Sequence, residues 1–558
     1  MKKVLLMVFV AVAIIATTLI IGIKRMITIQ PPVVNYIDTS LFKTVYIGDS
    51  LVLCDSSWLH KSNTGLFELY TQGDPYYRGL IEGKLTHELL QRQEKIFVGQ
   101  LKKCIPSKSY QRFLIFLVKL FNRNIDSFVK PEYLREIYGV SQYADKEYDF
   151  IGSNYQRMLN YHAAHDIGHM MQNYHLVGCT SFAVWGNNSK DSSLLIGRNF
   201  DFHINDEFAE DKIISFVKPD SGYNYMMITW GGMTGVVSGM NVQGLTVTLN
   251  AAKSYMPRHV ACPVSLMAKH ILQYAKNIQE AYQIARQYKV FVSESFLIGS
   301  AHDGRAYIIE KSPEKTVLYS GDSSVIICTN HFQSDAFSSD KFNDRQKKET
   351  PSLYRLNRTK QLIKKNCPLD EAGIATVLRD PKGMDDLNIG YTNEMAVNQY
   401  VAHHSVIFKP GKLLVWVSTK PYQLGTYVCY DLNNIFNNKE YLKPHHELYE
   451  FDLSLWPDSA LLSEYFSKVS GYIKIRDSFI NDIRSKSALI GEQDIKRMIQ
   501  LNPEFYQACY LAGEYYYNTG MYEKALTYYK MALNRQIPYY SDRELIKERI
   551  NSCNAKMN

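Results

Sequence analysis

A chain of 558 residues exceeds the size of a single ordinary core, so three or four structural units are expected. Hydrophobic residues make up 46% and charged residues 21%, a balance that is typical of a globular protein and excludes a largely disordered one. The net charge of +8 is spread without a dense basic block, so we expect no nucleic-acid partner. The nine cysteines include no CxxC pair, which argues against a zinc ribbon or a dithiol redox site.

Residues 4–23 form an uncharged apolar run with two basic residues at each end. At the rise of a helix, such a run spans the hydrocarbon core of a bilayer. A cleaved signal peptide has a shorter apolar centre and a small-residue exit site, whereas Ala11–Ala13 lies in the middle of this run. We therefore expect residues 1–28 to be a membrane anchor rather than a removed signal, with the body outside the cytoplasm, at a bacterial periplasm or cell surface. The equal basic flanks leave the orientation open.

Residues 37–178 are expected to be mainly helical. The clearest helical patterns cover residues 77–85, 111–121 and 154–174. The last of these helices ends just before Gly178, so Cys179 begins a new element.

The helix expected at residues 154–174 carries three histidines. His165 and His169 are four residues apart and His162 lies on the same side, a geometry suited to zinc. The glutamate of a His-Glu-x-x-His metalloprotease is absent, because Asp166 stands in its place. We therefore prefer a packed or hydrogen-bonded role for these residues and expect neither a metal nor a cofactor. A zinc hydrolase is kept as an alternative that metal analysis would test.

From Cys179 to about residue 425 the pattern changes to short strands separated by turns. Two helices are expected among them, at residues 263–275 and 278–287. Strand blocks that enclose a helical pair predict an α+β fold of packed sheets with helices outside. The expected strands cover residues 180–185, 194–199, 213–217, 225–228, 236–240, 245–249, 295–298, 306–310, 325–329, 404–408 and 412–417.

The chain from about residue 452 is expected to be helical again. Residues 506–532 resemble one tetratricopeptide repeat, because small and aromatic residues fall at the positions of that repeat: Gly513, Tyr516, Ala525, Tyr529 and Ala532. One repeat cannot bury its face alone, so we expect it to pack on neighbouring helices. A protein partner at this tail is a further hypothesis.

The central stretch is Gly178-Cys179, a thiol at the start of an apolar run. Alone it is also typical of a buried structural cysteine. Further motifs follow it along the chain, and together they favour a catalytic cysteine. With these motifs the chain resembles the self-processing cysteine peptidase family of isopenicillin N acyltransferase. It resembles the choloylglycine hydrolase and penicillin V acylase group more distantly. The motifs are Gly178-Cys179-Thr180-Ser181, Arg198-Asn199-Phe200-Asp201, Gly239 to Asn250, Cys328-Thr329-Asn330, Ser352-Leu353-Tyr354-Arg355 and His404-Ser405-Val406.

This resemblance covers roughly residues 70–420 and implies the αββα sandwich of N-terminal nucleophile hydrolases. It also implies a precursor that cuts itself between Gly178 and Cys179. The expected organisation is an anchor at 1–28, a helical pro-segment at 29–178, a hydrolase core at 179–430 and a helical, tetratricopeptide-like region at 431–558.

The resemblance assigns the roles of the site residues. Cys179 would be the nucleophile and its new α-amine the base, because a free α-amine has a pKa near ~7.7. Arg198 would favour the thiolate and Asp201 would orient the α-amine. Asn250 would donate to the oxyanion, and Asn330 would complete or orient this oxyanion hole. Arg355 would stabilise charge near the nucleophile, with Arg358 as its competitor.

The function expected from the resemblance is a cysteine amidase or acyltransferase that cleaves a linear amide through a Cys179 thioester. The anchor favours an N-acyl amide of lipid-like character as substrate, and a bile-salt or penicillin-type amide is the narrower alternative. The alternative outside the enzymes is a membrane-tethered, inactive scaffold that recruits partners through its tail.

Overall fold

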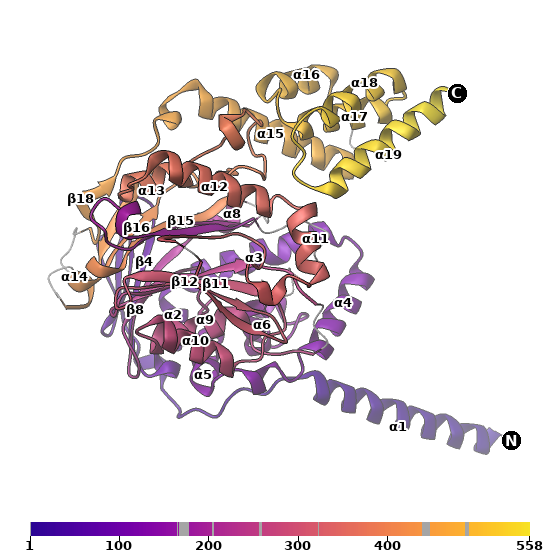
Figure 1. Ribbon diagram of the computed structural model, residues 1–558. Coiled ribbons are helices and arrows are strands. Elements are labelled where there is room, and N and C mark those ends of the chain that lie inside the picture. The colour runs from indigo at the N-terminus through magenta and orange to yellow at the C-terminus, as the bar shows by residue number, and fades with distance from the viewer. Residues whose placement is uncertain are drawn as a thin grey trace.

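The structure is a computed structural model that describes residues 2–163, 166, 178–202, 206–255, 259–321, 323–437, 447–485 and 490–558. Figure 1 shows two stacked sheets with helices on their outer faces, a helix that projects from the N-terminal end of the body, and a group of helices at the C-terminal end. The expected α+β class and the expected C-terminal helical region are therefore confirmed.

The larger sheet has 11 strands among the described residues, in the order β1-β2-β3-β4-β7-β8-β9-β10-β11-β12-β13. β4 and β7 pair in parallel, from Phe67 with Ile213 to Gly73 with Pro219, and the other neighbours are antiparallel. The chain before Cys179 thus builds one edge of this sheet. Its strands are β1 Thr44–Ile47, β2 Leu51–Cys54, β3 Ser57–Lys61, β4 Phe67–Gly73, β7 Ile213–Pro219, β8 Tyr225–Thr229, β9 Ser238–Asn241, β10 Leu245–Ala251, β11 Glu294–Ser300, β12 Arg305–Lys311 and β13 Thr316–Tyr319.

The smaller sheet has seven strands among the described residues, in the order β14-β5-β6-β15-β16-β17-β18, all antiparallel. Its middle strand is β15, and the neighbouring β6 pairs with β5 on one side and β15 on the other. The strands are β5 Thr180–Val184, β6 Leu195–Asp201, β14 Val325–Cys328, β15 Ala402–Lys409, β16 Leu414–Ser418, β17 Tyr427–Asp431 and β18 Glu450–Leu455.

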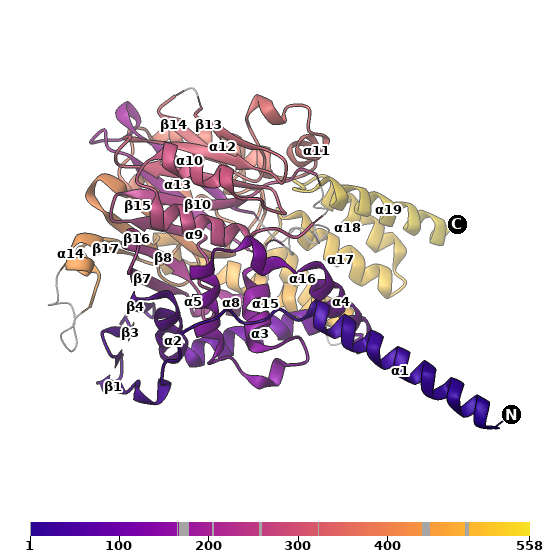
Figure 2. The same cartoon turned by 90° about the horizontal axis from the view of Figure 1, so that it is seen from below.

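Helices cover the outer face of each sheet (Figures 1 and 2). Helices α2, α9 and α10 lie on the larger sheet, and α12 and α13 lie on the smaller one. The bounds are α2 Pro75–Leu85, α3 His87–Cys104, α4 Lys108–Phe121, α5 Pro131–Ser141, α6 Asn154–His162, α8 Asp206–Glu210, α9 Val264–Tyr274, α10 Ile278–Gln287, α11 Lys341–Glu349, α12 Ser352–Asn366, α13 Glu371–Leu378 and α14 Leu432–Asn437.

Helix α2 begins where the sequence supplies both a cap and a proline. The Asp74 side chain accepts a hydrogen bond from the Tyr76 backbone N–H at 2.9 Å, and Pro75 occupies the first turn. Gly79 allows α5 to approach, because a Cβ at this position would lie 2.1 Å from the Glu136 carbonyl oxygen. The two helices therefore pack as one unit on the larger sheet.

The space between the sheets is filled by apolar side chains. Ile196 and Val406 of the smaller sheet belong to one buried cluster with Ile214 and Leu297 of the larger sheet. A second cluster joins the larger sheet to its helices and contains residues from both sides of Gly178. Residues before and after Cys179 therefore share one core.

Two of the expectations about secondary structure are wrong. Residues 44–73 are not helical but form β1 to β4, because they pair with one another and then with β7. The chain near Asp452 is not helical either, since residues 450–455 form β18 and extend the smaller sheet beyond residue 430. The helix expected at 154–174 is present as α6 up to His162, and residues 164–165 and 167–174 lie outside the described residues.

The C-terminal helices pack on one another through small and aromatic side chains. Gly513 of α17 lies against Tyr529 of α18, where a Cβ would come within 2.5 Å of the ring, and Tyr516 stacks on Tyr528 with centroids 5.3 Å apart. This is the close approach expected of a tetratricopeptide-like hairpin, although the repeat type and a protein partner stay predictions. The bounds are α15 Glu464–Ser485, α16 Glu492–Leu501, α17 Tyr506–Asn518, α18 Tyr522–Leu533 and α19 Tyr540–Met557.

The C-terminal helices also hold a loop of the body, residues 388–400, which we call the 388–400 loop. The Asn502 side chain accepts from the Tyr391 N–H at 2.9 Å and donates to the Tyr391 carbonyl at 3.0 Å. The Asn393 side chain donates to the Gln536 carbonyl at 3.2 Å. The tail is therefore attached to the body next to the start of β15.

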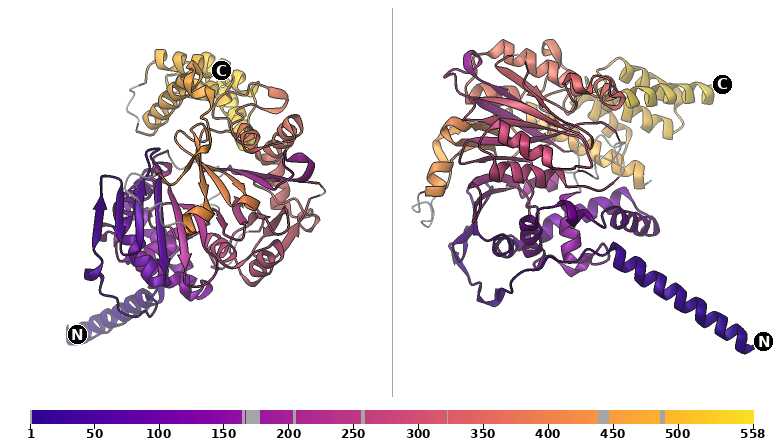
Figure 3. Two further views of the ribbon diagram at one scale, coloured as in Figure 1. Left: turned by 90° about the vertical axis from the view of Figure 1, so that its left-hand side faces the viewer. Right: turned by 60° about the horizontal axis from the view of Figure 1, so that its bottom comes forward.

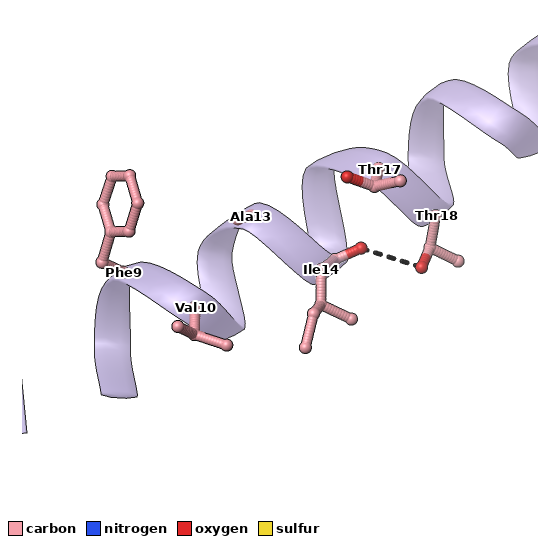
Figure 4. A pocket seen from close by; sticks show the side chains of 6 residues that line it. All are labelled: Phe9, Val10, Ala13, Ile14, Thr17 and Thr18. Atoms are coloured by element: carbon pink, nitrogen blue, oxygen red, sulfur yellow. Dashed lines mark hydrogen bonds between the residues drawn. The ribbon is translucent and has the colours of Figure 1, made fainter. Parts of the chain in front are cut away.

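Helix α1 (Lys2–Ile27) points away from the body (Figures 2 and 3). Its part from Leu5 to Ile27 has a mean hydropathy of 2.8 and is long and apolar enough to cross a membrane. Figure 4 shows one face of this helix, on which the Thr18 hydroxyl donates to the Ile14 carbonyl at 2.8 Å. Its polar side chain is thus satisfied within the helix, as an apolar environment requires.

Candidate active site

Cys179 lies directly before β5, opposite the end of β6. The register pairs Thr180 with Asn199, and the Gly178 N–H donates to the Asp201 carbonyl at 3.1 Å. This pairing brings the Gly178-Cys179 step to the Arg198–Asp201 motif, as the strand order requires. Both Gly178 and Cys179 are buried.

Arg198 is a cation in contact with the sulfur. Its Nη2 atom lies 3.9 Å from the Cys179 Sγ atom, and the guanidinium packs over the Phe200 ring at 4.6 Å. Burial raises the pKa of the Cys179 thiol to about 11, and the charge of Arg198 opposes this rise. The thiol is therefore protonated at neutral pH while residue 179 is inside the chain.

Asp201 is buried at the end of β6. The Gln399 side-chain amide donates to its Oδ2 atom at 3.1 Å, whereas its Oδ1 atom has no hydrogen-bond partner among the described residues. Burial raises the pKa of this carboxyl to about 7, with the charges of Arg355 and Arg198 acting in the opposite direction. One carboxylate oxygen is thus available for a further donor.

The two asparagines link the sheets beside the cysteine. Asn250, at the end of β10, accepts from the Ser181 hydroxyl at 3.0 Å and donates to the Cys328 carbonyl at 3.0 Å. Asn330, just after β14, donates to the Ala251 carbonyl at 3.0 Å. Both amides are buried and oriented by these contacts.

Arg355, in the first turns of α12, connects Asn330 to the cysteine. Its Nη1 atom donates to the Cys179 carbonyl at 2.6 Å, and its Nη2 atom donates to the Asn330 Oδ1 atom at 2.6 Å. The competitor Arg358 instead forms ion pairs at 2.9 Å with Asp380 and at 2.7 Å with Asp386. The structure thus brings Arg355, and not Arg358, to the other five predicted site residues.

Three further side chains complete this cluster and were missed as site residues. Ser238 lies 2.8 Å from the His404 Nε2 atom, and Arg198 donates to the same Ser238 hydroxyl. His404 was noticed only as part of a motif, and burial keeps its pKa well below the ordinary value. Gln399 carries no sequence signal that we can identify, since it is a single amide in a loop.

Of the three histidines expected on the helix before Cys179, the structure describes only His162. The Nδ1 atom of His162 contacts the Met158 carbonyl at 2.7 Å, and its Nε2 atom accepts from the Thr234 N–H at 2.9 Å. His165 and His169 lie outside the described residues. Within the described ranges, no group of three or more His, Cys, Asp or Glu residues has the arrangement of a metal site.

The fold and site thus define an α+β protein with a buried cysteine, arginine and aspartate between two sheets. Residues 187–393 match the sequence model of the acyl-coenzyme A:6-aminopenicillanic acid acyl-transferase family. This range begins shortly after Cys179 and includes the other predicted site residues, Arg198, Asp201, Asn250, Asn330 and Arg355. No curated protein sequence matches the chain.

Solved structures with some similarity include two kinds of hydrolase. One is the Caenorhabditis elegans ortholog of N-acylethanolamine-hydrolyzing acid amidase, at 17% identity and a TM-score of 0.30, over 42% of this chain and 93% of that chain. Two are variants of conjugated bile acid hydrolase from Clostridium perfringens, at 13% and 15% identity and TM-scores of 0.31 and 0.32. Each covers 46% of this chain and 93% of its own.

Proposed function

We propose that the protein is a self-processing cysteine amidohydrolase or acyltransferase that cuts itself between Gly178 and Cys179 and then cleaves a linear N-acyl amide. The observation that carries this proposal is the contact of the buried Cys179 sulfur with Arg198, beside the partly unpartnered carboxylate of Asp201. The family match to residues 187–393 supports the same class of chemistry.

The uncut chain would be an inactive precursor. Cys179 has an amide nitrogen in place of an amine there, and its thiol has a pKa of about 11. Cleavage would create an α-amine with an ordinary pKa near ~7.7, which accepts the proton of the neighbouring thiol near neutral pH. The Oδ1 atom of Asp201, which has no hydrogen-bond partner within the described ranges, would accept a hydrogen bond from this amine and hold it against the sulfur.

The mature site would then act through a thioester. The thiolate, stabilised by Arg198, attacks the acyl carbonyl of the substrate, and the Asn250 and Asn330 amides stabilise the tetrahedral oxyanion. The amine of the substrate leaves with the proton held by the α-amine. Water or a second amine then takes the acyl group, which restores the free thiol.

The surface near α1 supports a membrane-anchored protein, and we propose a lipid-like N-acyl amide as its substrate. Helix α4 contacts the base of α1 and contains basic residues but no acidic ones. Such a helix suits the interface of an anionic membrane. Its exposed apolar residues are Tyr110 and Phe113, each 53% exposed, with Phe116 and Leu117.

The deciding experiment compares the intact mass and the N-terminal sequence of the wild type and a Cys179→Ala variant. We expect two wild-type fragments, the second beginning Cys-Thr-Ser-Phe, and one uncut chain in the variant. Cys429→Ala, which replaces another buried thiol, should still be cut and serves as the control. A wild type that stays whole would overturn self-processing and favour the scaffold alternative.

A further inference from the structure

Gln399 lies in the 388–400 loop just before β15 and is completely buried. Its side-chain nitrogen donates to the Gly178 carbonyl oxygen at 2.7 Å and to the Asp201 Oδ2 atom at 3.1 Å. The Gly178 carbonyl belongs to the peptide bond that self-processing would break. The Gln399 amide is therefore positioned on an atom that would react.

The amides assigned to the mature oxyanion hole are directed elsewhere in the uncut chain. The side-chain nitrogen of Asn250 donates to the Cys328 carbonyl, and that of Asn330 donates to the Ala251 carbonyl. Among the described residues, Gln399 is thus the side-chain amide that donates to the Gly178 carbonyl in the uncut chain.

We propose that Gln399 is a catalytic residue of self-cleavage, whose amide stabilises the oxyanion that forms on the Gly178 carbonyl. The inference rests on the proposed function, because it concerns the same cut. In the first step the Cys179 sulfur bonds to the Gly178 carbonyl carbon, the peptide C–N bond breaks, and the thiol proton ends on the Cys179 nitrogen. Water then hydrolyses this thioester, which gives a Gly178 carboxylate and a free Cys179 thiol.

The close approach of Gln399 requires a glycine at position 178. A Cβ on residue 178 would lie 2.7 Å from the Gln399 Oε1 atom and would push the amide away. On the other side, the loop is held by the neighbouring Asn398, whose side chain accepts from the Tyr400 N–H at 3.0 Å. The donor is thus fixed before the reaction begins, as preorganised oxyanion stabilisation requires.

The test follows the conversion of the full-length chain into two fragments in a pulse-labelled cell-free synthesis. Gln399→Leu removes the donor, and we expect it to slow cleavage by about 10²- to 10³-fold. The matched control is Gln423→Leu, since Gln423 is an equally buried glutamine that donates to the Leu378 carbonyl at 3.3 Å. We expect this control to be cut at close to the wild-type rate.

A second variant separates the hydrogen bond from simple packing. Gln399→Glu keeps the shape of the side chain, and only its protonated form can donate to the Gly178 carbonyl. Its cleavage rate, divided by the wild-type rate at each pH, should rise as the pH falls from about 8 to about 5, because burial and the Asp201 carboxyl, which the Gln399 nitrogen contacts at 3.1 Å, raise the pKa of such a carboxyl. Gln399→Leu should show no such recovery.

The outcomes are distinct. Wild-type rates of cleavage in folded Gln399→Leu, or a ratio for Gln399→Glu that does not change with pH, would overturn the role of Gln399 and leave the proposed function standing. A wild-type chain that is never cut would overturn both. If Gln399→Leu lacks the near-ultraviolet circular dichroism of uncut Cys179→Ala, the pH series of Gln399→Glu decides alone.

Discussion

Arg198 of the smaller sheet contacts Cys179 while it is held by acceptors of the larger sheet. Its guanidinium donates to the Val237 carbonyl at 2.7 Å, to the Leu249 carbonyl and to the Ser238 hydroxyl. The cation beside the sulfur is therefore held at the junction of the two sheets, and its position depends on their packing.

We expect Arg198→Gln to move the ascending limb of the pH–rate profile of self-cleavage, on which the rate rises as the Cys179 thiol ionises, to higher pH by roughly one unit. The charge of Arg198 lowers the pKa of the Cys179 thiol, and one pKa unit is about a tenfold change in thiolate. Arg198→Lys keeps the charge and should shift the limb less. Arg157→Lys, a change at a buried arginine that pairs with Glu94 at 2.8 Å, is the control. An unshifted profile in Arg198→Gln would contradict this role.

Asp201 should make the uncut chain less stable as the pH rises. Its pKa is raised from 3.8 to about 7 by burial, so the folded state holds this proton more tightly than the unfolded state. The resulting contribution to the free energy of unfolding is complete below pH about 4 and is lost as the pH rises through about 7.

This sign can be checked with urea denaturation of Cys179→Ala, which stays uncut, at pH 5 and pH 8.5. The fall in stability between these values should shrink when Asp201→Asn is added, since an amide does not titrate. Equal falls with and without Asp201→Asn would count against a raised pKa. Because the comparison is a difference, other groups that titrate in this range cancel.

The two fragments should stay associated after cleavage. Tyr430 donates to Glu68 of β4 at 2.7 Å, and Lys269 pairs with Glu136 of α5 at 2.7 Å in the buried interior. Each of these contacts joins the chain before Cys179 to the chain after it. We expect one peak on a native sizing column and two only after denaturation. Two peaks under native conditions would show that the shared core does not keep the two fragments together.

Glu136→Ala provides a graded version of this test. It leaves the Lys269 ammonium buried without its partner, a change that typically costs about 3–5 kcal/mol. The fragments of this variant should separate at a lower urea concentration than those of the wild type. Glu349→Ala, which removes an exposed i,i+4 pair with Arg345, should leave the dissociation midpoint unchanged.

Gly390 should matter for the attachment of the C-terminal helices. It has a φ of +80°, and a Cβ on it would lie 2.6 Å from the Phe505 backbone nitrogen. Gly304 also has a positive φ, of +62°, but a Cβ there would meet nothing within 4 Å. Alanine at either position strains the backbone by roughly 1–2 kcal/mol. Only Gly390→Ala should also release α15 to α19 to limited proteolysis, and equal release from both variants would exclude the contact as the cause.

The strands of the body could be predicted where the local sequence has the composition of a strand and is bounded by turns. Residues 245–249 alternate β-branched and apolar side chains between turns, and β10 lies there. The strands β1 to β4 were missed, although β1 to β3 pair with their sequence neighbours, and β4 alone also pairs with a distant strand, β7. The pairing, rather than composition, makes these residues strands.

The site shows the same division. Arg198 and Asp201 were found because they lie in a motif on one strand, and β5 pairs with that strand directly after Cys179. Gln399 could not be found, because only the path of the loop before β15 brings it to Gly178. Choosing Arg355 over Arg358 likewise required the orientation of α12, which presents one arginine to the cysteine and the other to Asp380.

The parallel ladder between β4 and β7 has a consequence for where the enzyme resides. Cleavage before Cys179 would leave α1 on one polypeptide and the nucleophile on another, with no covalent tether between them. Residence at the membrane would then depend on this ladder and the core around it. Any condition that separates β4 from β7 would release the polypeptide that carries Cys179 and leave α1 in the membrane. The stability of this strand pair and the core around it would therefore decide whether that polypeptide stays at the membrane.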